Sequence, residues 1–248
     1  MPTALVTNAL EFAGPPSVAA LIAAGFRVVA HDVAFADAAR RSAFEAAQPG
    51  VTALAAQAAD EIVAAACAAA DGIDVLVSND AYPAIHGPIE HAALDDLRRT
   101  LERLVVFPFA LARAAIPKLK ARAGSRVVMI TSNRTRLPLN GGAIPDAARA
   151  ALNALVKSLS LELAPHGIPV NAIAPNYLYS ETYYPRAVFV DDPRGRAFIE
   201  QVVPVGRLAR PEEIGELVRF LATAQGSFMT GAIIDFSGGW PAAPARPA

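Results

Sequence analysis

The chain has 248 residues, 54% of them hydrophobic, and a formal net charge of −1 at pH 7. This composition is typical of a globular protein, and a charge so close to zero provides no broad basic surface for nucleic acid or an anionic membrane. Because the single cysteine excludes an internal disulfide framework and no apolar run approaches membrane-spanning length, we expect a soluble protein, with the cytoplasm as its default location.

Strand and helix signals alternate from the N-terminus onward. Residues 3–7 are predicted to form a buried strand, followed by a turn and a helix that Gly25 terminates. A second strand, residues 26–32, ends at Asp32. Dinucleotide-binding folds often have an acid on the adenosine ribose at this point, but a helix cap or a solvated strand end explains Asp32 equally well. The next elements alternate between helix and strand over residues 36–47, 51–56, 60–70 and 73–80.

The second half of the chain continues the alternation. A long helix is expected over residues 93–119, with Pro108 kinking it or marking an irregularity. The tyrosine-rich segment 177–195 lacks periodicity, so we interpret it as an excursion that covers the substrate rather than a packed element. The remaining elements are a strand from residue 126, a helix that extends to residue 164, a strand over 168–176, a capped helix over 211–223 and a last strand over 232–240.

Seven strand signals alternate with helices, and neither an internal repeat nor a linker divides the chain. We therefore predict a single α/β domain over residues 1–240, a Rossmann-like doubly wound fold with a mostly parallel seven-stranded sheet flanked by helices. Residues 241–248 are predicted to be a loose C-terminal tail. Open sheets of this class bind ligands beyond the carboxyl ends of their strands. The pocket is therefore expected to come from residues 7–14, 78–86, 132–140 and 175–187.

Ser132 and Arg149 are the leading candidates for chemistry. Ser132 comes at the end of an apolar strand, and Arg149 lies on the next helix. A hydroxyl at the carboxyl end of a strand that faces a basic residue is suited to holding a substrate oxygen and to tuning a nearby acid or base. Each residue also has an ordinary structural interpretation, as a turn cap and as a solvated helix residue. His31 and His86 have no partners at metal-ligand spacing, so we expect no metal site.

Several motifs occur together in one known family. They are VSNDA, MITS, the spacing from Ser132 to Arg149, and VNAIAP followed by GRLARPEEI and a closing GG. In these motifs the chain resembles the short-chain dehydrogenase/reductase family over nearly its whole length. Cofactor-using members carry a TGxxxGxG turn, whose glycines let the backbone approach a pyrophosphate. Here Phe12 replaces the first glycine of the GxG and Leu104 replaces the family's helix asparagine, so we expect no nicotinamide cofactor.

The same replacements resemble the halohydrin dehalogenases, a cofactor-free branch of that family. The matching segments are VTN at 6–8, VSND at 77–80 and PNYL at 175–178. The resemblance implies that a tyrosine phenolate deprotonates a haloalcohol, that Ser132 hydrogen-bonds the same oxygen, and that Arg149 keeps the phenolate accessible. The alkoxide then expels halide and closes an epoxide. The residues that the resemblance implies for substrate and halide binding are Phe12, Pro175, Asn176, Tyr177 and Leu178.

One position departs from this pattern. The family spacing puts the tyrosine four residues before Arg149 on the same helix face, and that residue is Pro145. Three interpretations remain open. In the first, Asp146 acts as the base, although a carboxylate is shorter and far less basic than a phenolate. In the second, catalysis is lost and the pocket only binds a ligand. In the third, a side chain from a loop reaches the site. The loop candidates are Tyr82, His86, Tyr177, Tyr179, Tyr183 and Tyr184.

The leading hypothesis is a halohydrin dehalogenase-like lyase that interconverts vicinal haloalcohols with epoxides plus halide, without a nicotinamide cofactor and with impaired or rerouted base catalysis. The first alternative is a divergent NAD(P)-dependent short-chain oxidoreductase, and the second is a catalytically inactive ligand-binding homologue. The expected partners are a small-molecule haloalcohol or epoxide and a halide ion, with no nucleic acid and no membrane. Family resemblance also implies a homo-oligomer, either a dimer or a homotetramer.

Overall fold

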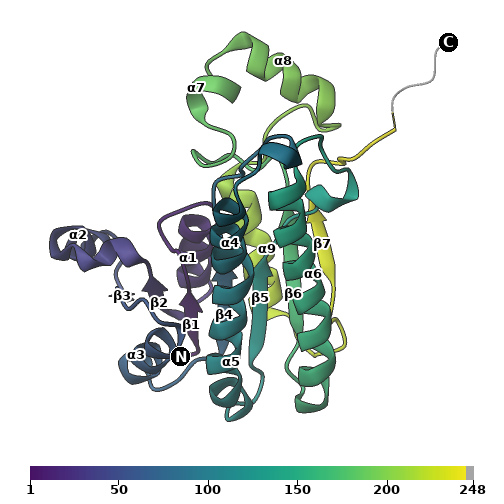
Figure 1. Ribbon diagram of the computed structural model, residues 1–248. Helices are drawn as coiled ribbons and strands as arrows, with labels where there is room; N and C mark the ends of the chain where they lie inside the picture. The colour runs from purple at the N-terminus through teal and green to yellow at the C-terminus, as the bar shows by residue number, and fades with distance from the viewer. Residues whose placement is uncertain (244–248) are drawn as a thin grey trace.

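Seven strands form the centre of the molecule. They are β1 (Thr3–Val6), β2 (Arg27–His31), β3 (Val51–Leu54), β4 (Val75–Asn79), β5 (Arg126–Ile130), β6 (Val170–Pro175) and β7 (Ile233–Phe236). The computed structural model describes residues 1–243. All seven strands are parallel, in the order β3-β2-β1-β4-β5-β6-β7 (Figure 1). The predicted Rossmann-like fold is therefore confirmed, and the sheet is wholly rather than mostly parallel. The strand order reverses between β1 and β4, and open α/β sheets bind ligands beside such a reversal.

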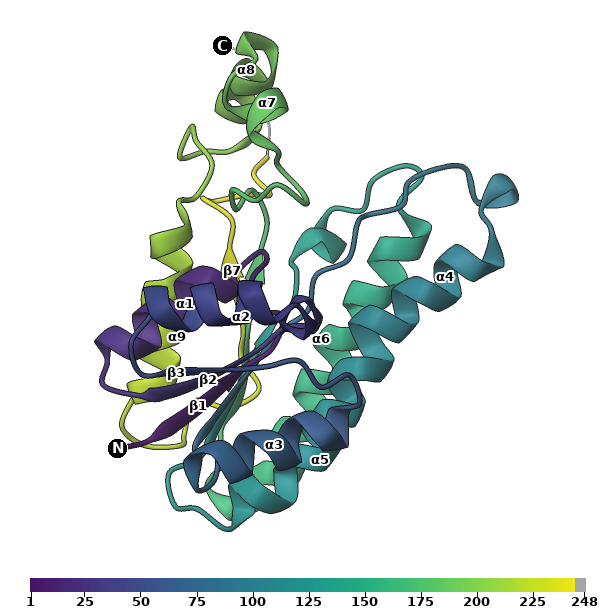
Figure 2. The same ribbon diagram turned by 90° about the vertical axis from the view of Figure 1, so that its left-hand side faces the viewer.

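Helices cover both faces of this sheet (Figure 2). They are α1 (Gly14–Ala23), α2 (Ala38–Ala47), α3 (Ala59–Ala70), α4 (Leu94–Leu101), α5 (Phe107–Lys120), α6 (Ala143–Leu163), α7 (Arg186–Phe189), α8 (Pro193–Val202) and α9 (Pro211–Thr223). Helices α1 and α9 pack together on one face, and α3 and α5 pack together on the other. Side chains alternate along each strand, so Val6 joins the first core and Leu5 the second. Burial on both faces explains why the strands read as continuous apolar runs.

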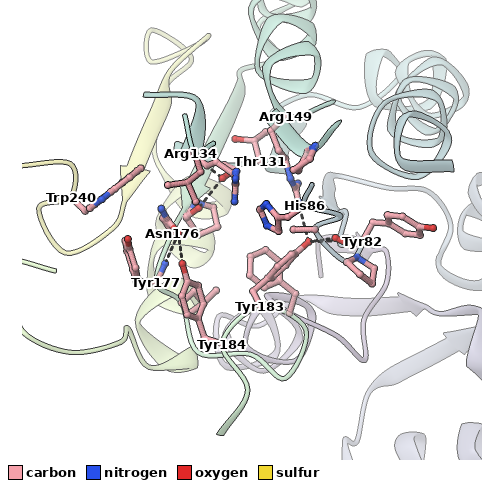
Figure 3. A pocket seen from close by; sticks show the side chains of 18 of the residues that line it. Tyr82, His86, Thr131, Arg134, Arg149, Asn176, Tyr177, Tyr183, Tyr184 and Trp240 are labelled. Atoms are coloured by element: carbon pink, nitrogen blue, oxygen red, sulfur yellow. Dashed lines mark hydrogen bonds between the residues drawn. The ribbon is translucent and has the colours of Figure 1, made fainter. Parts of the chain in front are cut away.

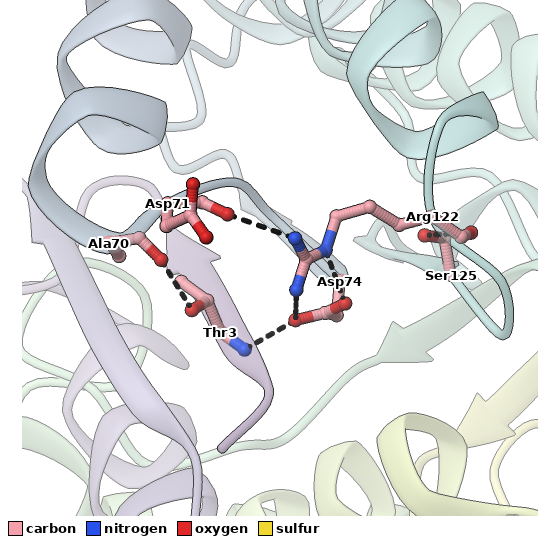
Figure 4. Close-up of polar contacts among 6 residues, drawn as sticks. All are labelled: Thr3, Ala70, Asp71, Asp74, Arg122 and Ser125. Atoms are coloured by element: carbon pink, nitrogen blue, oxygen red, sulfur yellow. Dashed lines mark hydrogen bonds and ion pairs between the residues drawn. The ribbon is translucent and has the colours of Figure 1, made fainter.

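The carboxylate of Asp74 links several segments at the amino-terminal ends of the strands (Figure 4). Asp74 accepts a hydrogen bond from the Thr3 amide at 2.7 Å and another from Arg122 Nε at 2.7 Å. Arg122 also donates to the carbonyl oxygen of Asp71 at 2.9 Å. These bonds join the starts of β1 and β4 to the segment that follows α5. They lie at the end of the sheet opposite the strand termini at which ligands bind in this fold class.

Pro108 interrupts the long helix predicted over residues 93–119. The structure has α4, then a wide π-helical turn over Glu102–Val106, then α5. Proline has no amide hydrogen and its ring crowds the preceding turn, so a regular α-helix cannot pass this position with all its hydrogen bonds. The predicted irregularity is present, and the widened turn contains Leu104, whose side chain lines a cavity at the carboxyl ends of the central strands.

The segment expected to be irregular, residues 177–195, contains α7 and the start of α8. The prediction of an excursion without packed elements is therefore wrong, because helices this short are too brief to show a sequence period. Asp192 caps α8 through its side chain. Ile199 and Val203 pack with Tyr177 in a small apolar cluster separate from the two main cores. Figure 1 shows α7 and α8 above the carboxyl ends of the strands, where they cover the edge that binds ligands in this fold class.

Gly195 sets how closely α7 and α8 approach. A Cβ atom at this position would overlap the carbonyl oxygen of Val188, which cannot move without displacing α7. We expect Gly195→Ala to separate the two helices and to speed amide hydrogen exchange in residues 186–203 at least tenfold, equivalent to about 1.4 kcal/mol of local stability. Gly87→Ala is the matched control, because a Cβ there meets no atom within 4 Å. Equal exchange rates in the two variants would contradict this prediction.

The end of the chain after β7 has no regular structure in its described part, residues 237–243. Residues 244–248, which make up most of the predicted loose tail, lie outside the described residues. Among residues 1–243, no helix combines the length and the apolar character needed to cross a bilayer.

Candidate active site

A cavity of about 500 Å³ lies at the carboxyl ends of the central strands, with side chains of α7 and α8 in its wall (Figure 3). Its volume is within the range of small-molecule sites. All four segments predicted to form the pocket contribute to the wall. So do all seven residues singled out from the sequence, namely Phe12, Ser132, Arg149, Pro175, Asn176, Tyr177 and Leu178.

Ser132 follows β5 and lines the cavity, with 9% of the residue exposed. Its Oγ accepts a hydrogen bond from the Arg134 amide at 3.2 Å and donates to the carbonyl oxygen of Pro175 at 3.3 Å. Asn153 of α6 donates to the Ser132 carbonyl at 2.9 Å and so fixes the strand end against the helix. The bond to Pro175 is long, so a substrate oxygen in the cavity can replace that carbonyl as the acceptor at little cost.

Arg149 points from α6 into the same cavity and is 95% buried, with 5% exposed. One guanidinium nitrogen, Nη1, donates to the carbonyl oxygen of Asp80 at 3.0 Å. The other, Nη2, donates to the phenolic oxygen of Tyr183 at 2.9 Å. Both acceptors are uncharged oxygens, so the guanidinium keeps a positive charge directed at the cavity. Any oxygen that gains negative charge beside Nη2 is stabilised there.

Pro145 lies in the first turn of α6, one turn before Arg149, and its ring lines the cavity. Proline is tolerated there because a first-turn residue does not need its amide for the helix. The helix is therefore in the register that the spacing predicts. The wall next to Arg149 consequently presents an apolar ring where a proton acceptor was expected.

Asp146 does not replace the missing acceptor. Its carboxylate forms an ion pair with Arg134 and takes no part in the cavity wall formed by the described residues. His86 does line the cavity, but burial and the nearby Arg134 charge hold its pKa below the usual value, so the neutral imidazole is favoured. No group of three or more His, Cys, Asp or Glu side chains within residues 1–243 is arranged to bind a metal ion.

Three loop tyrosines direct their hydroxyls away from Arg149. Tyr184 donates to Asn176 Oδ1 at 2.6 Å, and burial raises its pKa. Burial also raises the pKa of Tyr177, whose ring packs against the Tyr184 ring in a tilted arrangement, with 5.3 Å between the ring centroids. Tyr179 donates to Glu181 at 2.6 Å in an exposed contact. Within residues 1–243, none of these three hydroxyls forms a hydrogen bond with Arg149.

Tyr183 is the tyrosine that faces Arg149 (Figure 3). Its oxygen accepts a second hydrogen bond from the Tyr82 amide at 3.0 Å and donates to the Tyr82 carbonyl at 2.9 Å. The edge of its ring packs against Phe12, with the ring centroids 5.0 Å apart. A short turn from Ser180 to Tyr184 directs the side chain inward. The sequence offered Tyr183 as one of several candidates, and no local signal distinguished it from its neighbours.

The segment after β6 forms a tight bend at the base of the cavity. Tyr177 has a positive φ of 57°, and its amide donates to Asn176 Oδ1 at 3.0 Å. Ala209 holds the bend from outside, because its amide donates to the Tyr177 carbonyl at 2.9 Å and its carbonyl accepts from Tyr179 at 3.1 Å. Hydrogen bonds within residues 1–243 leave the Leu178 amide without an acceptor. Tyr177 and Leu178 were both implied as halide-binding residues, and of their two backbone amides only that of Leu178 has no hydrogen-bond acceptor among the described residues.

Asp80 is a buried carboxyl group behind Arg149. Burial raises its pKa to about 6, although Ser78 and the Arg149 charge act in the opposite direction. Ser78 Oγ donates to Asp80 Oδ2 at 2.7 Å, and Asn8 reaches Oδ1 at 3.5 Å. The carboxyl group therefore changes its protonation state in the weakly acidic range while it is enclosed in the fold.

This pKa makes stability depend on pH in a defined direction. Between about pH 4 and pH 6 the folded protein binds a proton at Asp80 that the unfolded chain has lost, so stability falls as pH rises through this window. We expect Asp80→Asn to remove on the order of 1 to 3 kcal/mol of that fall, as measured by urea unfolding at pH 4.5 and pH 7. Asp95→Asn, at an exposed ion pair with Arg98, is the control. An unchanged pH slope in Asp80→Asn would refute the assignment.

Residues 14–241 match the family model described as enoyl-(acyl carrier protein) reductase. Human dehydrogenase/reductase SDR family member 4 is 31% identical over 182 residues, which are 73% of this chain. The chain belongs to the short-chain dehydrogenase/reductase superfamily. The human match spans 64% of the relative's own length, whereas an uncharacterized oxidoreductase of Bacillus subtilis, YmfI, matches over 96% of this chain and 98% of its own at 30% identity.

The similar solved structures include two dehalogenating enzymes and one complex with NADP. A structure described as a dehalogenation enzyme is 35% identical with a TM-score of 0.92, covering 96% of this chain and 98% of its own. A halohydrin dehalogenase bound to ethyl (2S)-oxiran-2-ylacetate is 35% identical with a TM-score of 0.95, covering 99% and 100%. Pseudomonas aeruginosa RhlG with NADP is 26% identical with a TM-score of 0.86, covering 96% and 95%. The chain is thus similar in structure to halohydrin dehalogenases, while its curated sequence relatives are named as oxidoreductases.

The dinucleotide that this superfamily implies does not fit the β1–α1 turn. Pyrophosphate binding at a helix N-terminus needs free backbone N–H groups. In the first turn of α1, Pro15 and Pro16 have no amide hydrogen, and the Gly14 amide donates to the Glu11 carbonyl at 2.8 Å. Phe12 adopts a φ of 51° and projects its ring into the cavity from the same turn. The two prolines were visible in the sequence, and their missing amides are a signal that sequence reasoning overlooked.

Asp32 also lacks the role that a dinucleotide would give it. Its Oδ2 accepts a hydrogen bond from the Leu10 amide at 3.1 Å, and its Oδ1 accepts from the Ala34 amide at 2.9 Å. The carboxylate caps the short helical turn Val33–Ala36 and pins the β1–α1 turn. Of the two readings left open by the sequence, the helix cap is the one found. Both oxygens are engaged by backbone amides instead of facing a ribose.

Proposed function

We propose that this protein is a cofactor-independent lyase that interconverts vicinal haloalcohols with epoxides plus halide. The observation that carries the proposal is the β1–α1 turn, in which Pro15, Pro16 and Phe12 take the place of a pyrophosphate site. Ser132 and Arg149 still line the neighbouring cavity. A member of the superfamily that keeps these two residues but has no room for a dinucleotide needs a reaction without hydride transfer. Ring closure by an internal alkoxide is such a reaction.

In this proposal Ser132 donates its hydroxyl proton to the substrate oxygen in place of the Pro175 carbonyl. Arg149 supplies positive charge beside the proton-transfer site. The Leu178 amide donates to the departing halide, which is held well by neutral donors and polarisable aromatic edges. Phe12 supplies such an edge in the cavity wall. Aromatic and aliphatic side chains make up most of the remaining wall, so substituents on the haloalcohol carbon are expected to be apolar.

Two comparisons support the proposal. The chain is 35% identical to a dehalogenation enzyme and to a halohydrin dehalogenase with a bound epoxide ester, each over at least 96% of this chain. The matches extend through the cap formed by α7 and α8. The structure of Pseudomonas aeruginosa RhlG with NADP has a lower identity, 26%.

Halide release from several chloro- and bromohydrins tests the proposal directly. We expect one halide ion and one proton per epoxide formed. A parallel titration uses Trp240, the only tryptophan in the sequence, which lines the cavity 5.7 Å from the Tyr177 ring. Saturable quenching of its fluorescence by bromide, reversed by chloride, reports halide in the pocket. Absence of halide release above the buffer background for every substrate would refute the lyase assignment.

A divergent oxidoreductase is the second candidate, because the curated relatives are named as dehydrogenases, reductases and oxidoreductases. Titration with NADH and NADPH separates it from the first. The lack of amide donors at the start of α1 predicts no saturable change in nicotinamide fluorescence. Saturation below millimolar cofactor would favour the oxidoreductase instead.

A ligand-binding homologue without catalysis is the third candidate, and Pro145 is the observation that favours it. It predicts bromide quenching of Trp240 without turnover of any haloalcohol.

We also propose that the protein is a homo-oligomer, since α5 and α6 leave large apolar side chains such as Phe109 and Leu161 exposed. Light scattering of the full chain tests this, and a monomer would refute it.

A further inference from the structure

We propose that Tyr183, from the segment between β6 and α7, is the catalytic acid and base of this site, in place of the side chain missing at Pro145. The proposal rests on the haloalcohol–epoxide function proposed above. It concerns a residue that is distant from α6 in sequence and reaches the site only through the fold. Three observations support it: the contacts of the Tyr183 oxygen, the fixed position of its ring, and the absence of a proton acceptor in the side chain of Pro145.

The phenolic oxygen of Tyr183 has the surroundings that a proton-transfer oxygen needs. Two donors converge on it, Arg149 Nη2 at 2.9 Å and the Tyr82 amide at 3.0 Å. One of these donors carries a full positive charge, which makes its hydrogen bond stronger as negative charge develops on the acceptor. The proton of Tyr183 is directed at the Tyr82 carbonyl at 2.9 Å. A substrate oxygen in the cavity is an alternative partner for that proton, because Tyr183 itself lines the cavity.

The ring of Tyr183 is held from several sides, so the oxygen does not depend on a mobile side chain. Phe12 packs edge-on against it at 5.0 Å between centroids. Its own amide donates to Ser180 Oγ at 3.2 Å, and the Tyr184 amide closes the turn on the Ser180 carbonyl at 2.8 Å. Positioning by packed neighbours is what keeps a catalytic group in register with its substrate.

Pro145 and Tyr183 are complementary parts of one wall. A residue one turn before Arg149 on α6 faces the same space beside the guanidinium. Pro145 and Tyr183 both line the cavity with Arg149, and the phenol of Tyr183 contacts Arg149 Nη2 where the ring of Pro145 offers no polar atom. A tyrosine at both positions would direct two phenols at one guanidinium. The proline is therefore consistent with a relocated acid and base rather than a site that has simply lost one.

In ring closure, the Tyr183 phenolate takes the hydroxyl proton of the haloalcohol. The alkoxide oxygen attacks the neighbouring carbon, a C–O bond forms, and the C–X bond breaks with its electron pair leaving on the halide. The proton is then released to solvent, so each turnover yields one epoxide, one halide and one proton. In the reverse direction halide attacks an epoxide carbon, and Tyr183 O–H donates its proton to the opening oxygen.

Tyr183→Phe tests this role, because it removes the hydroxyl and keeps the ring against Phe12. We expect kcat/KM for bromohydrin ring closure to fall about a hundred- to thousandfold. Bromide quenching of Trp240 is expected to keep its wild-type midpoint, because the halide contacts are unchanged.

Tyr179→Phe is the matched control, since it removes a hydroxyl of the same segment that contacts Glu181 on the surface. Wild-type activity and quenching are expected for it. If wild-type protein releases halide and Tyr183→Phe retains that rate within about threefold, the Tyr183 role is wrong while the function stands. If wild-type protein releases no halide from any haloalcohol, the function and the Tyr183 role both fail. A loss of activity together with a shifted bromide midpoint would mean that Tyr183 shapes the pocket, and would also overturn the role.

Discussion

Replacing Arg149 by methionine is expected to lower kcat/KM for epoxide formation about a thousandfold. Methionine retains much of the aliphatic part of the side chain but removes the charge that contacts the Tyr183 oxygen, together with the hydrogen bond to the Asp80 carbonyl. In the proposed mechanism the positive charge stabilises a transition state in which negative charge is shared between the phenol and the substrate oxygen. Steady-state halide release over a range of bromohydrin concentrations measures the effect.

Arg149→Lys is the informative companion to this variant. Lysine keeps the charge but cannot hold the Asp80 carbonyl and the Tyr183 hydroxyl in the two fixed directions of a guanidinium. We expect a loss between those of wild type and methionine, of about ten- to a hundredfold. Circular dichroism and bromide quenching of Trp240 check that both variants are folded. Full activity in folded Arg149→Met would show that the guanidinium plays no part in proton transfer.

A phenol placed on α6 is expected to substitute for the phenol of Tyr183. The double variant Pro145→Tyr with Tyr183→Phe is expected to recover at least tenfold of the kcat/KM lost in Tyr183→Phe alone. The new side chain at 145 lies one turn before Arg149, so its oxygen can reach the guanidinium from the helix side. Pro145→Phe with Tyr183→Phe controls for the change in volume and should recover nothing. Recovery by both double variants would trace the effect to packing rather than to the hydroxyl.

The single variant Pro145→Tyr provides a further test of complementarity. With Tyr183 still present, two phenols compete for one guanidinium, and the new ring takes cavity space. We expect this variant to be no more active than wild type. Activity more than tenfold above wild type would instead indicate a decayed enzyme in which Tyr183 contributes nothing.

Much of the fold follows from patterns within short segments. Strands buried on both faces read as apolar runs, and the strand that ends before Ser132 could be located from its own residues. Pro108 marked the break between α4 and α5 because its missing amide acts locally. The segment over residues 177–195 lines the cavity as predicted, but its helices were missed, because α7 spans four residues and shows no helical period. Its helices are fixed instead by packing between Gly195 and Val188 and by the cluster around Ile199.

The sequence by itself determined that a serine and an arginine share the strand end and the following helix, that a phenylalanine replaces a glycine in the first turn, and that residue 145 has no proton acceptor. These are matters of residue identity at fixed local spacing, which a helix or strand period converts directly into relative position. Only the tertiary structure decided which loop side chain meets the arginine. Tyr183 and Arg149 are 34 residues apart and belong to different segments of the fold. The other tyrosines of the loop have similar neighbours in the sequence, so the sequence does not distinguish Tyr183 from them. Which tyrosine contacts the arginine depends on the path of the segment after β6. Long-range contacts with Phe12, Tyr82 and Ala209 determine that path, and no local sequence pattern encodes them.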